Sequence, residues 1–71
     1  MNPKPQVGDI WCFSNLGAKF YYLVLDYNEH DPDKWDADSV TLLSFTSFEY
    51  PTIKEGVSRI MADSKRWRFI S

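Results

Sequence analysis

The feature that most constrains the fold is a run of nine residues, KFYYLVLDY, at positions 19–27. Aromatic and aliphatic residues of this kind favour β-strands. Successive side chains of a strand point to opposite faces of a sheet, and large apolar residues here occupy both sets of alternate positions. The run therefore predicts a central strand that is covered on both faces, with the rest of the chain forming the sheet around it.

The segment before this strand predicts its first neighbour. In residues 7–13, VGDIWCF, strand alternation places Ile10 and Cys12 on one face and Trp11 and Phe13 on the other. The next residues, SNLGA, predict a hairpin turn in which Asn15 and Gly17 supply the positive φ angles.

Three more strands are predicted after the central one. They are residues 39–45 (SVTLLSF), 47–54 (SFEYPTIK) and 66–71 (RWRFIS). Pro51 makes the second of these an edge strand or a bulged one. In the last, alternation turns Trp67 and Phe69 inward and Arg66 and Arg68 outward.

Residues 54–65, KEGVSRIMADSK, allow two structures. Val57, Ile60 and Met61 have the spacing of one helical face, which favours a short α-helix or 3₁₀ turn. Glu55 and Gly56 could instead close another hairpin. We expect the helical turn.

These elements predict a mainly β fold, a small five-stranded SH3-like barrel with a short helical or 3₁₀ turn before the last strand. Closure would remove the unpaired edges of such apolar strands. A five-stranded OB-type barrel is the alternative, although OB domains are usually longer. Pro3 and Pro5 predict a poorly packed extended arm over residues 1–6, followed by a single domain over residues 7–71.

Length and composition limit the class of protein. The chain has 71 residues, which suits one small domain. Cys12 is the only cysteine, so no internal disulfide can form, and a reducing compartment is expected. Because no segment resembles a signal peptide or a membrane span, we expect a soluble cytoplasmic protein, monomeric or homodimeric, that contacts no membrane.

The segments VGDIWCF, KFYYLVLDY and RWRFIS together resemble small SH3-like barrel proteins of the kind found in phage genomes. That resemblance covers most of the chain, and it implies a shape and, for a phage protein, a location in the host cytoplasm. Residues 8–11, GDIW, also resemble the first strand of the MazF/PemK toxin fold, whose members are endoribonucleases. Those toxins continue with an arginine-proline pattern, which residues 12–20 lack, so ribonuclease activity is not carried over.

Residues 26–38 combine six acidic residues and one lysine with a tryptophan, Trp35. The start Asp31-x-Asp33 is like that of an EF-hand, but Asp36 stands where that loop needs glycine and Leu42 where it needs glutamate, so no metal site is expected. The acidic residues keep the domain soluble, and they favour a basic partner. We expect Trp35 to fold back over one end of the barrel. The alternative is that it stands out as an interface anchor.

No catalytic constellation is present. Cys12 and His30 could pair as nucleophile and base, but Cys12 fits a small buried residue of a strand. One cysteine and one histidine are too few for structural zinc. We therefore expect a non-enzymatic protein without a cofactor.

Two functions are left for comparison. The first is a protein-interaction module that binds a partner protein through the acidic segment and neighbouring aromatics: Trp11, Tyr27, Asp31, Asp33, Trp35, Asp36 and Tyr50. The second is a small nucleic-acid-binding barrel using basic residues near the C-terminus: Lys54, Arg59, Lys65, Arg66 and Arg68. The net charge of −2 argues against the second, because phosphate binding needs a basic surface.

Overall fold

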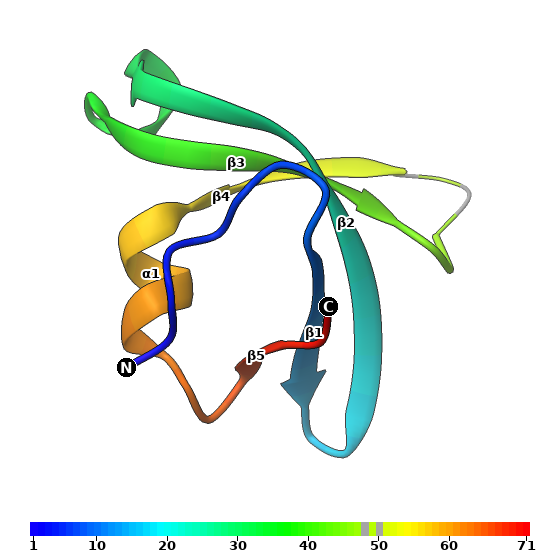
Figure 1. The fold of residues 1–71 in the computed structure, drawn as a ribbon. Coiled ribbons are helices and arrows are strands. Elements are labelled where there is room, and N and C mark those ends of the chain that lie inside the picture. Colours follow the sequence, from blue (N-terminus) through cyan, green and yellow to red (C-terminus); the bar gives the residue numbers. More distant parts are fainter. Residues whose placement is uncertain (48, 50) are drawn as a thin grey trace.

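The computed structural model describes residues 1–47, 49 and 51–71. Its strands are β1 (Ile10–Asn15), β2 (Ala18–Asp31), β3 (Ala37–Ser44), β4 (Thr52–Gly56) and β5 (Trp67–Phe69). They form one antiparallel sheet in the order β4-β3-β2-β1-β5 (Figure 1). A 3₁₀ helix, η1 (Pro32–Lys34), joins β2 to β3, and an α-helix, α1 (Val57–Ala62), precedes β5. The expected mainly β fold of five strands, with a short helix before the last, is confirmed, whereas closure into a barrel stays a prediction.

The length of β2 shapes the molecule. A straight strand of 14 residues would extend for roughly 46 Å, but the longest axis of the molecule is 31 Å. The pairing of β2 with β3 shifts register between Val24 and Asp26 and again between Asn28 and Asp31. Such bulges bend a strand, and Figure 1 shows β2 curving from its hairpin with β1 to its hairpin with β3.

The core lies on the concave face of this sheet. Trp11, Val24, Val40 and Leu42 from the strands are buried there together with Ile60 of α1. The expected alternation in β1 is confirmed, because the rings of Trp11 and Phe13 pack against those of Phe69 and Trp67 respectively. Val57 and Ile60 of α1 are buried and Met61 is half-buried against the same cluster, which confirms the helix in preference to a hairpin.

The prediction that β2 is covered on both faces is wrong. β2 is central, between β1 and β3, but Tyr21 and Leu25 are 38% and 37% exposed, while Val24 is buried. Among the described residues α1 is the only α-helix, and it packs on the face that carries the core, so Tyr21 and Leu25 on the convex face remain partly in solvent.

Two local expectations are also corrected. In the β1–β2 turn the positive φ angles belong to Leu16 and Gly17, and Asn15 is the last residue of β1. The N-terminal arm is not poorly packed, because Pro5 is buried and the amide of Asn2 donates hydrogen bonds to the carbonyls of Ile60 and Trp67.

No helix in the part of the chain that the structure describes is long and apolar enough to cross a membrane.

Candidate functional site

The β2–β3 hairpin ends in a turn that is built on Asp31. The Asp31 side chain accepts a hydrogen bond of 3.0 Å from the N–H of Asp33, which starts η1, and the Asp31 carbonyl accepts another of 3.0 Å from the N–H of Asp36. Trp35 ends η1 with φ of 61°, followed by Asp36 with φ of 63°. The acidic segment is therefore mostly strand and tight turn.

Trp35 stands out from this turn. The residue is 96% exposed. The prediction that Trp35 folds back over the end of the domain is wrong, and the alternative, an exposed ring, is what the structure shows. The reason is the left-handed backbone at Trp35, which directs the chain back into β3 and leaves the ring outside.

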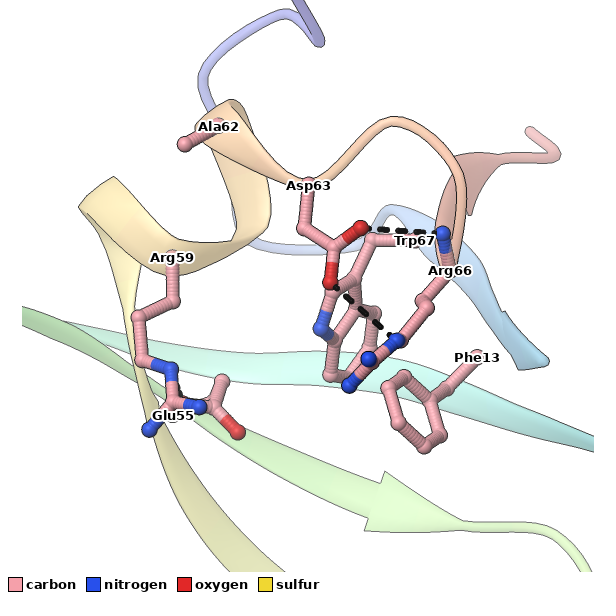
Figure 2. A pocket seen from close by; sticks show the side chains of 7 residues that line it. All are labelled: Phe13, Glu55, Arg59, Ala62, Asp63, Arg66 and Trp67. Carbon is pink, nitrogen blue, oxygen red and sulfur yellow. Dashed lines mark hydrogen bonds and ion pairs between the residues drawn. The ribbon is translucent and has the colours of Figure 1, made fainter. Parts of the chain in front are cut away.

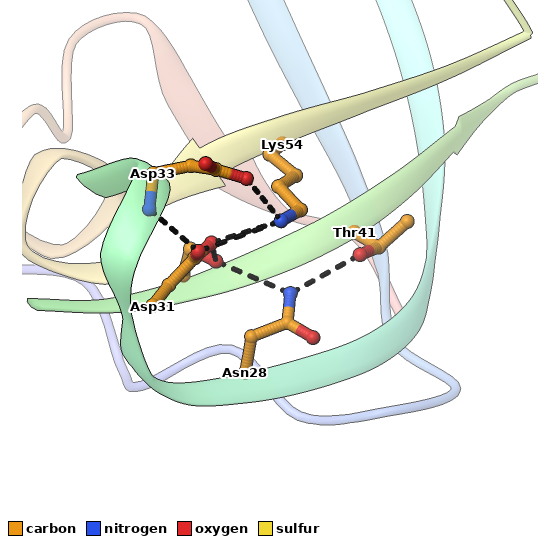
Figure 3. Close-up of polar contacts among 6 residues, drawn as sticks. Asn28, Asp31, Asp33, Thr41 and Lys54 are labelled. Carbon is orange, nitrogen blue, oxygen red and sulfur yellow. Dashed lines mark hydrogen bonds and ion pairs between the residues drawn. The ribbon is translucent and has the colours of Figure 1, made fainter. Parts of the chain in front are cut away.

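A network of polar side chains lies beneath the turn and joins three strands (Figure 3). The hydroxyl of Ser39 in β3 donates to Asp31 at 2.5 Å, and the amide of Asn28 donates to Ser39 and to Thr41, both at 3.1 Å. Lys54 of β4 lies 3.3 Å from the Asp31 carboxylate and 3.0 Å from that of Asp33. Asp31 and Ser39 are buried, and their partners satisfy them.

The charges in this network support one another. The Ser39 hydroxyl holds the pKa of Asp31 below its usual range, assisted by the N–H of Asp33 and by the Lys54 ammonium. Hydrogen bonds to Asp33 and Asp31 raise the pKa of Lys54. Because each group is ionised near neutral pH, the pair fixes β4 to the base of the hairpin.

A second contact secures the other side of the hairpin. The Tyr27 hydroxyl donates to Asp38 at 2.5 Å, and Asp38 also accepts from the N–H of His30 at 3.2 Å. Burial and the bond to Asp38 raise the pKa of Tyr27, while the same bond lowers the pKa of Asp38. The Lys4 ammonium lies 4.8 Å from the centre of the Tyr27 ring. Tyr27 therefore supports the hairpin, and its hydroxyl is already engaged.

A cleft of about 320 Å³ opens beside Trp35. Its walls come from the hairpin tip, from the end of β4 and from the start of α1, and they are formed by Lys34, Trp35, Ala37, Glu55, Gly56, Ser58 and Arg59. A neighbouring cleft of about 370 Å³ shares Glu55 and Arg59 with the first and has Phe13 and Trp67 among its walls. Figure 2 shows these two rings beside the pair formed by Asp63 and Arg66. The two clefts adjoin at the Glu55–Arg59 pair, whose charged atoms are 3.9 Å apart.

The structure separates the residues predicted to bind a protein. Trp35, Asp33 and Asp36 are exposed together at the hairpin tip. Trp11 is 0% exposed, so it offers no surface to a partner, and Asp31 is buried inside the network. Tyr50 lies outside the described residues.

The residues predicted to bind nucleic acid are largely engaged with carboxylates. Lys54 pairs with Asp31 and Asp33, Arg59 lies against Glu55, and Arg66 lies 3.7 Å from Asp63. These pairs neutralise part of the positive charge on which phosphate binding would depend. Lys65 and Arg68 are exposed.

The candidate nucleophile and base are in different surroundings. Cys12 is buried in β1, as expected of a small core residue, whereas His30 is exposed near the end of β2. Among the described residues there is no group of three or more His, Cys, Asp or Glu side chains that could hold a metal ion.

Sequence reasoning missed two surface features, which lie at different places on the molecule. Leu16, at the tip of the β1–β2 hairpin, is 99% exposed and has φ of 52°. The cleft beside Trp35 was also missed, because it forms only when the hairpin, β4 and α1 come together. An apolar residue inside a predicted turn was the available signal for Leu16.

Comparison of this chain with family models, with curated proteins and with solved structures finds no match. The function of the domain is therefore inferred from the geometry of the hairpin tip and its clefts.

Proposed function

We propose that this domain is a non-enzymatic protein-interaction module that binds a partner protein through the tip of the β2–β3 hairpin, with Trp35 as the anchor. The observation that carries the proposal is the exposure of Trp35, a residue that is 96% exposed and has φ of 61°. A left-handed conformation costs an ordinary residue on the order of 1 kcal/mol, and glycine or asparagine would suit it better. Neither the core nor the turn needs tryptophan here, whereas tryptophan is enriched among the residues that dominate interfaces.

The surroundings of Trp35 suit a side chain of a partner. The adjacent cleft of about 320 Å³ has Ala37 and Gly56 beside charged residues at its rim. Asp33 and Asp36 lie on either side of Trp35 along the turn and are exposed, although Asp33 also pairs with Lys54. This combination favours a partner segment that places an apolar side chain in the cleft and basic side chains near the two carboxylates.

The network below the turn favours binding by holding the tip in one conformation. Asp31 is bonded to η1 on one side and to β3 and β4 on the other. A preorganised loop loses less conformational entropy when a partner binds. An accessory factor of this kind, cytoplasmic and acting in the host if phage-encoded, also fits the buried single thiol and the resemblance to small phage barrels.

A displayed library of random peptides tests the proposal. Peptides enriched on the wild-type domain should bind the Trp35→Ala variant at least about 30-fold more weakly, as expected when a dominant anchor is removed. Leu16→Ala is the matched control, because Leu16 is equally exposed in a left-handed conformation at the other hairpin. Equal affinity for wild type and Trp35→Ala would contradict the proposal.

Tryptophan fluorescence gives an independent readout. Trp11 and Trp67 are 0% and 4% exposed, so acrylamide should quench Trp35 selectively, and a bound peptide should protect it. Titration with single- and double-stranded oligonucleotides at low salt should leave the emission and the mobility of the protein unchanged. Tight, steeply salt-dependent binding would favour the basic residues near the C-terminus instead.

A further inference from the structure

The two edges of the sheet differ in how they are covered. At the β5 edge, the carbonyl of Trp67 accepts a hydrogen bond from Asn2 and its N–H donates to the carbonyl of Asp63. Pro3 and Lys4 lie close to Phe69, the last residue of β5, around one small cleft. The N-terminal arm thus protects this edge from further pairing.

The β4 edge has no such cover among the described residues. The N–H of Ser44 donates to the carbonyl of Pro51, one step beyond Leu43 and Thr52, the last pair of the β3–β4 ladder, so that ladder alternates from a hydrogen-bonded position at Ser44 and Pro51. Alternation along β4 then turns the N–H and C=O of Ile53 and Glu55 toward β3. The same groups of Thr52, Lys54 and Gly56 point away from the sheet.

Only the middle of this edge is available. The outward N–H of Gly56 donates to its neighbour Glu55 at 3.1 Å. Thr52, Ile53 and Lys54 are all exposed, including the apolar Ile53 at 36%. Edge lysines usually discourage strand pairing, but the Lys54 ammonium is drawn to Asp31 and Asp33 and is neutralised there.

We propose that β4 pairs antiparallel with β4 of a second copy of this chain, around a twofold axis at Ile53, so that two sheets become continuous. In this register Thr52 faces Lys54 of the second copy, and their outward N–H and C=O groups form four hydrogen bonds across the axis. The two Ile53 residues meet as a close pair without hydrogen bonds, which suits β-branched side chains.

The charged side chains along β4 are compatible with pairing to a second copy of the chain. Lys54 stands opposite the neutral Thr52, and Glu55 stands opposite Pro51, so no like charges face each other directly. The two Lys54 side chains lie diagonal to one another, each already paired with Asp31 and Asp33 of its own copy. The contact leaves Trp35 outside the pairing and does not depend on the proposed partner binding, although it would place two hairpin tips on one assembly.

Analytical ultracentrifugation of the full chain, from the micromolar range to about 1 mM, tests the pairing. A dimer with a Kd below about 1 mM is expected. Thr52→Pro removes an outward donor without touching the bonds to β3, and Ile53→Lys places like charges on the axis; each should raise the Kd at least about tenfold. Ile70→Lys, near the opposite edge at 43% exposure, is the matched control and should keep the wild-type Kd.

Amide hydrogen exchange gives the site-specific result. The amides of Thr52 and Lys54 should exchange rapidly in dilute protein and slow down with rising concentration, while those of Ile53 and Glu55 stay protected throughout and show that each variant is folded. A chain that remains monomeric at about 1 mM, or a dimer that Thr52→Pro and Ile53→Lys leave unchanged, would overturn the proposal. Exchange at Thr52 and Lys54 that does not change with concentration would overturn it as well.

Discussion

Positive φ angles distinguish four side-chain-bearing residues of the described chain, namely Leu16, His30, Trp35 and Asp36. Aspartate tolerates the left-handed region comparatively well, but leucine and tryptophan do not. Each costs on the order of 1 kcal/mol relative to a residue that suits the turn. Trp35 and Leu16 combine this strain with nearly complete exposure, so neither is explained by the stability of the domain.

Trp35→Gly should therefore stabilise the domain while weakening partner binding. Glycine adopts φ near 60° without strain, and the lost ring makes few contacts, so we expect the free energy of unfolding to rise by about 1 kcal/mol. Urea denaturation followed by circular dichroism measures it. A loss of more than about 1 kcal/mol would mean that the ring packs on the domain after all.

The position of Trp35 shows where prediction from sequence stops at this scale. Its charged neighbours show that Trp35 breaks strand alternation, but not whether the ring folds inward or outward. That choice depends on the bonds from Asp31 to Asp33 and Asp36, which fix where the turn closes. The error in the first hairpin also concerns where a turn closes. The positive φ angle predicted for Asn15 lies one residue later, at Leu16.

At the scale of elements, Ser39 is the centre of the network that joins the hairpin to the sheet. It is 0% exposed, donates to Asp31 and accepts from Asn28. Ser39→Ala leaves buried partners unsatisfied, so the free energy of unfolding should fall by about 1–3 kcal/mol. Thermal and urea denaturation measure the loss. Ser58→Ala, an exposed serine of α1, is the control and should change it by less than about 0.5 kcal/mol.

The lowered pKa values of Asp31 and Asp38 predict acid sensitivity. Both groups bind protons more weakly in the folded chain than in the unfolded one. As pH falls through the ordinary carboxyl range, the unfolded state takes up protons first, so stability decreases until the folded carboxylates are also protonated. Above that range Asp31 and Asp38 do not make the free energy of unfolding depend on pH. Urea denaturation between pH 2 and 7 measures the profile.

Ser39→Ala provides the internal check on this profile. The Ser39 hydroxyl is the main cause of the lowered pKa of Asp31. Its removal should therefore weaken the decrease in the free energy of unfolding at acid pH, and should also lower that free energy near neutral pH. An identical slope in wild type and variant would contradict the assignment to Asp31.

Most elements follow from the sequence because their side chains encode local periodicity. Val57, Ile60 and Met61 have helical spacing, and α1 packs these three residues on the core. The full length of β2 was harder to predict from the sequence. Its polar second half lacks apolar alternation, and it remains a strand because Asn28 and Asp31 bond to β3, a contact that no local pattern records.

At the scale of the whole molecule, the N-terminal arm holds distant parts of the chain together. Figure 1 shows the arm running beside α1. The side-chain amide of Asn2 lies 2.8 Å from the carbonyl of Ile60 and 2.7 Å from that of Trp67, and its backbone N–H donates to Met61. The prolines bias this segment away from helix, but they carry no information about Asn2, whose partners are 58 and 65 residues away.

Asn2→Ala should therefore lower the stability of the whole domain. It removes two hydrogen bonds and leaves the carbonyls at the end of α1 and in β5 without their donor, so we expect the free energy of unfolding to fall by about 2 kcal/mol. Gln6→Ala is the matched control, since it removes another amide from the same arm at an exposed position. Hydrogen exchange should show faster opening of residues 63–69, while the β2–β3 hairpin, held by its own network, keeps its protection. Equal stability of Asn2→Ala and Gln6→Ala would show that the arm rests on the domain without securing it, and the β5 edge would then be as open to pairing as the β4 edge.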